Sequence, residues 1–180
     1  NTPSSSNSSC VVVDEERLLA SKNVSLAWTM ELLGDCYFHT LQHRRAVSYY
    51  RQASLRRHIA SSSCPSLAVR KYHDHDGSDG AWSVKSGAEA NLRLKESRSL
   101  SALGNIVEAS SVIETIRQRS PYRTLAIAMT LGNLHVASGR YQDAIRAFLD
   151  ALTRNPYAME AIEMLALLNA DRNDVLRSLQ

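Results

Sequence analysis

The residues with the clearest capacity for chemistry lie in one polar stretch near the middle of the chain. His73, Asp74, His75 and Asp76 alternate two kinds of metal-binding side chain and are followed by Gly77. Imidazole and carboxylate groups bind zinc, but a zinc site holds its ligands in a fixed geometry. A Gly- and Ser-rich surrounding supplies no such frame, and no further ligand pair is spaced to close the site. We therefore expect a solvated loop without a metal; stoichiometric zinc binding would favour the alternative, a metal-dependent hydrolytic enzyme.

The remaining candidates for catalysis or cofactor binding are equally sparse. The three cysteines, Cys10, Cys36 and Cys64, have neither metal-site spacing nor the even number of a disulfide framework. No P-loop, nucleophile elbow or Cys/His pair with a placed base is present. The sequence predicts a protein that is not an enzyme and has no cofactor and no small-molecule substrate. Free thiols are typical of a reducing compartment, so we expect the nucleus and cytoplasm.

Charge and hydropathy narrow the range of partners. The 180 residues have a net charge of +3, and no apolar run approaches the roughly 18 residues that a membrane span needs. Positive charge gathers in one segment that is expected to be helical. Its members are Arg44, Arg45, Arg51, Arg56, Arg57 and His58. Because the excess is local and few aromatic residues accompany it, we predict a solvated outer face or one that meets an acidic partner. Nucleic acid is the alternative partner for this segment; we predict neither nucleic-acid nor membrane binding.

The elements that position these residues follow a fixed repeat. Gly139 lies 35 residues after Gly104, Ala144 lies 35 after Ala109, and Pro156 lies 35 after Pro121. Helical repeats with a period near 34 residues fold as stacked pairs of antiparallel helices, and such stacks form surfaces that hold other proteins. The sequence therefore predicts an all-α tetratricopeptide-repeat superhelix of antiparallel helix pairs.

The repeat divides the chain into six segments. Residues 1–15 form a disordered Ser-rich tail, 16–59 the first repeat, 60–87 an inserted loop, 88–123 the second repeat and 124–158 the third. Residues 159–180 form a partial fourth repeat or a capping helix. The loop follows from the 63 residues between Ala46 and Ala109, which exceed one repeat by about 28. We expect the chain to be a piece of a longer protein.

Small and aromatic residues mark the places where paired helices cross. Gly34 and Ala46 are small enough for a close crossing, with Tyr37 and Tyr50 filling the space on either side. In the third repeat Gly139 suits a helix C-cap, and Pro156 ends the second helix. The full set of structural positions is Gly34, Tyr37, Ala46, Tyr50, Gly104, Ala109, Gly132, Gly139, Ala144, Phe148 and Pro156. The first helix of the second repeat fits least well, because Arg93, Glu96 and Ser97 stand where apolar or small residues are typical.

A protein-binding groove is the main candidate site. In the first repeat Trp28, Glu31, Asp35 and Phe38 share one helix face by their spacing. The equivalent residues of the third repeat are Ala126, Met129, Asn133 and Val136. These residues either bind a partner peptide or helix, or pack within the chain and face solvent. Two acidic residues in the first repeat argue against a chaperone-tail adaptor, which needs cationic residues to hold a carboxylate.

Three passages together resemble the N-terminal region of the subunit 7 family of the anaphase-promoting complex, the ubiquitin ligase also called the cyclosome. They are residues 33–39 with 43–47 and 50–53, the Ser-rich insertion after the first hairpin, and residues 155–162. The resemblance implies a non-catalytic scaffold of cell division that forms a homodimer and stacks with other tetratricopeptide-repeat subunits. The alternative is a generic adaptor that binds a peptide or helix in its concave groove.

Overall fold

The computed structural model describes residues 8–63 and 86–179, with side chains for residues 18–61 and 86–179. Within these ranges the chain forms eight helices and no strand, and this confirms the all-α tetratricopeptide-repeat fold. The chain divides into two compact units, residues 1–79 and 80–180. Each unit is described by itself below.

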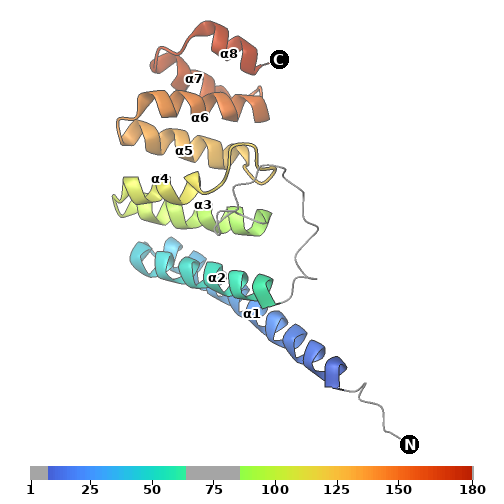
Figure 1. The fold of residues 1–180 in the computed structure, drawn as a ribbon. Coiled ribbons are helices and arrows are strands. Elements are labelled where there is room, and N and C mark those ends of the chain that lie inside the picture. The colour runs from blue at the N-terminus through green and yellow to red at the C-terminus, as the bar shows by residue number, and fades with distance from the viewer. Residues whose placement is uncertain (1–7, 64–85, 180) are drawn as a thin grey trace, which may run out of the picture. The chain divides into compact units, whose positions relative to one another are not determined.

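Unit 1 is a single helical hairpin. Helix α1 (Ser8–His39) and helix α2 (His43–Ser63) run antiparallel and pack together, and the N-terminal part of α1 extends beyond the end of α2 (Figure 1). Small side chains fill the contact between them: Ala27, Ala46 and Ala53 are fully buried. Tyr50 is the large side chain buried among them. The turn between the two helices covers residues 40–42.

The ends of unit 1 differ from the segments expected from composition. Helix α1 begins at Ser8, so residues 8–15 of the expected tail are helical. Once a helix is nucleated, each added residue gains a hydrogen bond at little further cost, and this outweighs a polar composition. Helix α2 extends to Ser63 and takes the first residues of the expected 60–87 insertion. Residues 64–85 of that insertion, with the His73 to Asp76 run, lie outside the described residues.

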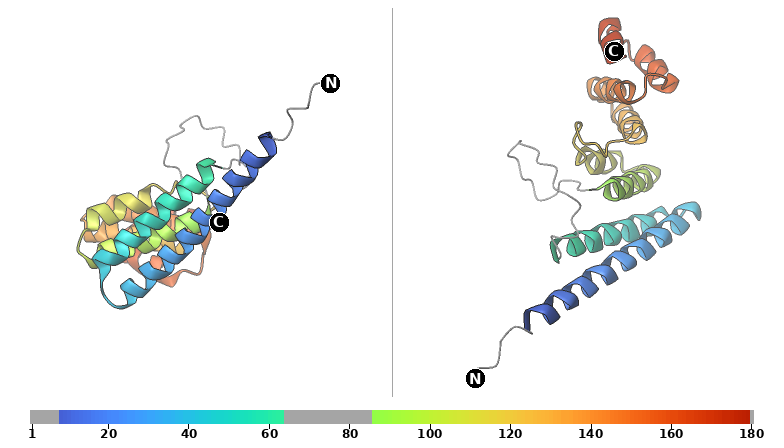
Figure 2. Two further views of the ribbon diagram at one scale, coloured as in Figure 1. Left: turned by 90° about the horizontal axis from the view of Figure 1, so that it is seen from below. Right: turned by 90° about the vertical axis from the view of Figure 1, so that its right-hand side faces the viewer.

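Unit 2 stacks six helices in chain order: α3 (Gly87–Ala102), α4 (Ile106–Glu114), α5 (Leu125–Ala137), α6 (Tyr141–Arg154), α7 (Met159–Leu167) and α8 (Arg172–Ser178). Each of the first four helices contacts the next, and α8 contacts α6 (Figure 2). The ring of Phe148 is fully buried in a core shared by α5, α6 and α7, with Ala128, Leu152 and Leu165. The last two helices form a short fourth pair.

Helix α3 forms despite its departures from the repeat pattern. The hydroxyl of Ser86 accepts a hydrogen bond from the Glu89 backbone N–H at 3.2 Å and so caps the helix. Ser97 is fully buried, and its hydroxyl donates to the Ala109 carbonyl at 2.8 Å. Because that hydroxyl has a partner, serine can stand at the close crossing of α3 and α4 without leaving an unsatisfied polar group.

The turn that closes each helix pair has the same backbone geometry. Leu41, Gly104, Gly139 and Asn169 have φ values of 60°, 81°, 76° and 52°. In all four turns the residue after the one with positive φ donates its backbone N–H to the carbonyl five residues before it, at 2.9–3.0 Å. This is the Schellman arrangement, in which glycine is usual because a Cβ crowds the left-handed conformation. Gly139 therefore caps its helix as its sequence predicts, and Leu41 adopts the same conformation without being glycine.

Two glycines allow an aromatic ring to lie against a helix backbone. A Cβ at Gly34 would be 2.5 Å from Tyr50 Cε1, and a Cβ at Gly132 would be 2.5 Å from Phe148 Cε1. Both distances are far below a carbon–carbon contact, so neither position accepts a larger residue unless the ring moves. In both cases the ring lies 16 residues after its glycine, so the two contacts occupy equivalent positions of their helix pairs.

Candidate functional site

Glu31, one of the four groove residues predicted in the first repeat, contacts the other helix of the hairpin. Its side chain forms an ion pair with Arg57 of α2, and the residue is only 8% exposed. The Arg57 guanidinium also lies over the Trp28 indole, 5.4 Å from the ring centroid. This arrangement combines charge pairing with a cation–π contact. Glu31 therefore helps to hold α1 on α2 and is not a free charge on a groove.

Asp35 is likewise tied to α2. The Tyr50 hydroxyl donates a hydrogen bond to Asp35 Oδ1 at 2.8 Å. Burial, and then the hydrogen bond to this carboxylate, raise the pKa of Tyr50 well above its usual value. The phenol stays neutral and keeps donating at any ordinary pH. The two acidic residues that argue against a carboxylate-binding groove thus have roles inside the first hairpin.

Phe38 and Trp28 differ in what they offer a partner. Phe38 lies near the turn, with its ring edge-on to His43 at 5.2 Å between centroids, and it is partly buried. Trp28 is 56% exposed, which leaves most of its indole accessible. Because exposed aromatic residues are frequent anchors of protein interfaces, Trp28 is the member of this set most suited to contact a partner.

The corresponding residues of the third repeat are divided between core and surface. Met129 and Val136 pack against the core around Phe148, while Ala126 and Asn133 are exposed on α5. The structure therefore places part of each predicted set against the chain's own helices. The assignment of the groove residues Trp28, Phe38, Met129 and Asn133 to a partner stays a prediction.

The basic residues of α2 are partly used within unit 1. Arg56 donates to the Asn23 side chain of α1 at 3.3 Å, and Arg57 pairs with Glu31. The Arg45 guanidinium lies over the Tyr37 ring, 5.6 Å from its centroid. Three of the basic residues predicted for an outer face, Arg45, Arg56 and Arg57, therefore contact α1 and help to hold the two helices together.

An exposed apolar face of α1 is the feature that sequence reasoning missed. Its members are Leu18, Leu19, Leu26, Leu32 and Leu33, all classed as exposed within unit 1. Leu19, Leu26 and Leu33 are seven residues apart, and Leu18 and Leu32 are fourteen apart. Seven residues are nearly two helical turns, so these side chains form two adjacent rows. The seven-residue spacing of the leucines is visible in the sequence. The repeat pattern, however, describes only the opposite, buried side of the helix.

The described residues contain neither a grouped set of metal ligands nor a helix suited to span a membrane. Among them, no three His, Cys, Asp or Glu side chains are grouped so as to hold a metal ion. Within the same ranges, no helix combines the length and the hydropathy needed to cross a bilayer.

Comparison with known proteins agrees with the architecture. A family model described as "Tetratricopeptide repeat" matches residues 125–168, which hold α5, α6 and α7. The chain is 30% identical over 178 residues to "Anaphase-promoting complex subunit 7" of Arabidopsis thaliana. The match covers 94% of this chain and 30% of that relative, so the chain spans under a third of the relative's length. Together with the stacked helix pairs, these findings identify an all-α tetratricopeptide-repeat fold, a fold typical of protein–protein interaction.

Proposed function

We propose that this chain is part of a non-catalytic scaffold subunit of a cell-cycle ubiquitin ligase of the anaphase-promoting complex type. The observation that carries the proposal is the similarity to an anaphase-promoting complex subunit along 94% of the chain. Stacked helix pairs support a role in holding other proteins, among them further tetratricopeptide-repeat subunits of the ligase. Such a scaffold would work in the nucleus and cytoplasm, and ubiquitin transfer would belong to other subunits.

The scaffold would form a homodimer through the apolar face of α1. Five exposed leucines on one helix face give a surface that gains free energy when it is removed from water. Between Leu18 and His39 the charged residues are Lys22, Glu31 and Asp35, and the two acids contact α2. Lys22, four residues from both Leu18 and Leu26, is then the charged side chain of this stretch that lies on the leucine face, so like-charge repulsion between two copies would come from this residue. A symmetric dimer requires such a self-complementary patch.

A pair of charge-introducing variants tests the dimer. Leu32 on α1 is 61% exposed, and Leu55 on α2 is 58% exposed, so the two positions are matched in residue type and accessibility. Light scattering behind size exclusion should give a mass near twice 20.0 kDa for the unaltered chain. Leu32→Glu should weaken the dimer at least about tenfold, because a charge would be buried in an apolar interface. Leu55→Glu should leave the mass unchanged.

The masses of the unaltered chain and of the two leucine variants decide whether the dimer forms and where its interface lies. A monomer at every concentration would refute the homodimer, while equal loss in both variants would place the interface elsewhere on unit 1. Circular dichroism of each variant checks that the helices remain. Gly34→Leu, which would drive a side chain into the Tyr50 ring, should abolish self-association by separating the hairpin; a full-strength dimer in that variant would count heavily against the proposal.

The second candidate function is an adaptor that binds a peptide or helix through Trp28 and Phe38. The specific observation in its favour is the 56% exposure of the Trp28 side chain. Trp28→Ala should weaken peptide capture, by about 2 kcal/mol for an interface anchor, and leave helicity intact. A monomeric chain with a Trp28-dependent partner would favour this function over the scaffold.

A further inference from the structure

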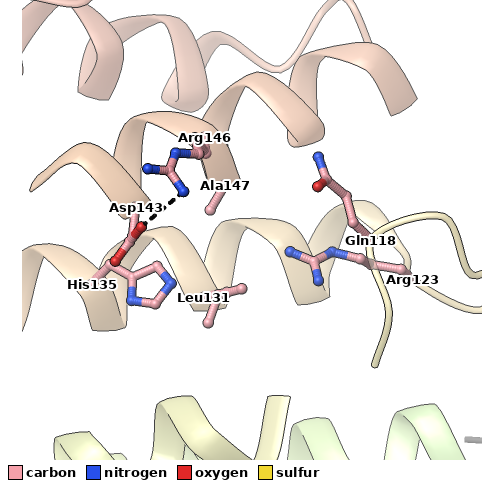
Figure 3. Close-up of a pocket in the computed structure, with 7 residues that line it drawn as sticks. All are labelled: Gln118, Arg123, Leu131, His135, Asp143, Arg146 and Ala147. Atoms are coloured by element: carbon pink, nitrogen blue, oxygen red, sulfur yellow. Dashed lines mark ion pairs between the residues drawn. The ribbon is translucent and has the colours of Figure 1, made fainter. Parts of the chain in front are cut away.

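A polar pocket lies between α5, α6 and the segment that precedes α5, wholly inside unit 2. Its volume is about 170 Å³. Leu131 and Ala147 give it an apolar floor. The polar side chains lie at its two ends, His135 with Asp143 and Arg146 at one and Gln118 with Arg123 at the other (Figure 3).

Arg123 is held rigidly at one end of this pocket. Its Nε donates to Asp150 Oδ2 at 2.8 Å, and its Nη1 donates to the Ile116 carbonyl at 2.9 Å. The residue is buried, yet it also lines the pocket. Two fixed bonds remove most of the rotamer entropy that a guanidinium otherwise loses on binding a ligand. Neither of these bonds uses the Nη2 nitrogen of the group.

His135 at the other end carries an unsatisfied buried atom. Its side chain is 5% exposed, and its Nε2 lies 3.7 Å from Glu114 Oε1. Its Nδ1 is buried and has no hydrogen-bond partner. A buried polar atom without a partner costs free energy, so a ligand that supplied a polar group here would be favoured. Burial, and then the nearby Arg140, lower the pKa of His135, so the ring is neutral at physiological pH.

Arg146 supplies the accessible cation of the pocket. It is 74% exposed, and its Nη1 lies 3.3 Å from Asp143 Oδ1. A surface pair of this kind is weak, so the guanidinium can exchange Asp143 for a ligand carboxylate. Asp143 pairs with Arg146, and Asp150 pairs with both Arg123 and Arg154, so the arginines around the pocket outnumber these carboxylates by one.

From this geometry we propose that the pocket binds an acidic side chain of a partner protein. The methylene groups of a glutamate would lie on Leu131 and Ala147, and its carboxylate would accept hydrogen bonds from Arg146, while Arg123 adds positive charge at the far end of the pocket. Hydrogen bonds between guanidinium and carboxylate are among the stronger ones in proteins. The proposal concerns a surface of unit 2 and holds whether or not the chain dimerises, so it goes beyond the scaffold role.

The test uses the full chain and a fluorescein-labelled hexaglutamate peptide, with hexaglutamine as the uncharged counterpart. Arg146→Gln should weaken hexaglutamate binding, measured by fluorescence anisotropy, about five- to tenfold. Arg177→Gln is the matched control, because Arg177 is 78% exposed and pairs with Asp174 at the same spacing as Arg146 with Asp143. Asp143→Asn should strengthen binding about two- to fivefold by removing the competing carboxylate.

Four results would overturn the proposal. These are no binding of hexaglutamate, equal binding of hexaglutamine, equal weakening by the two arginine variants, and binding of a phosphoserine peptide at least tenfold tighter through Arg146. The equal weakening would mean nonspecific attraction to a basic surface. The tighter phosphopeptide would mean that the pocket is built for a phosphate group. Arg146 is exposed, so its replacement is compatible with folding, and circular dichroism verifies this for each variant.

Discussion

Gly132 and Phe148 form a pair whose coupling can be measured. The equivalent residues one repeat earlier, 35 positions back, are Ser97 and Ile113, and both are fully buried. A helix crossing can therefore be filled by glycine against an aromatic ring or by serine against an aliphatic side chain. The structure predicts that exchanging only one member of the pair is costly and that exchanging both is tolerated.

The magnitudes follow from the contacts. In Gly132→Ser the new Cβ would lie 2.5 Å from Phe148 Cε1 in a full core, which should cost about 1–3 kcal/mol. Phe148→Ile should cost about 2 kcal/mol, because it leaves space in the core. The double variant should cost only about 1–2 kcal/mol, since the smaller side chain makes room for the serine. The coupling between the two positions is then about 2 kcal/mol.

Urea titration followed by circular dichroism gives the free energies of unfolding, and the melting temperature should move about 2–4 °C per kcal/mol. Gly87→Ser is the control, because a Cβ there would be 3.6 Å from Tyr122, an ordinary contact. It should change stability little. If the two single costs simply add in the double variant, to within about 0.5 kcal/mol, the crossing does not work as we describe.

Three further predictions concern single features of the fold. Leu41→Gly should raise stability by about 0.5 kcal/mol, since glycine relieves the left-handed φ of 60° but adds entropy to the unfolded chain; calorimetry that shows a lower melting temperature would contradict this. Asp150→Ala should cost about 3 kcal/mol or more in urea unfolding, because it strands the buried Arg123 guanidinium, and a loss no larger than that of a surface pair would refute it. The pKa of His135 is lowered in the folded state, so the unfolded chain binds more protons below pH of about 6.5. Stability should therefore fall as the pH drops from 7.5 to 5.5, and His135→Gln should flatten that dependence.

The sequence by itself determined the fold class and the register of its repeats. The 35-residue step places Gly104 and Gly139 in equivalent turns, and both have the positive φ that favours glycine. Gly34 lies at the close crossing that the pattern predicts; the structure adds that an aromatic ring lies directly against Gly34 and against Gly132. Such features are readable because one residue type is required by a local backbone conformation or by a contact at fixed spacing.

The functional surfaces depended on partners that are distant along the chain. Glu31 and Asp35 share a face on α1, but Arg57 and Tyr50 of α2 decide that both are used within the hairpin. The Arg123 side chain lies at the pocket of unit 2 because it is held there by a hydrogen bond to Asp150, 27 residues later. Helical periodicity states which side chains share a face, whereas burial and pairing on that face are set by the neighbouring helix. That is why the repeats could be read from the sequence and the acidic-side-chain pocket could be found only in the tertiary structure.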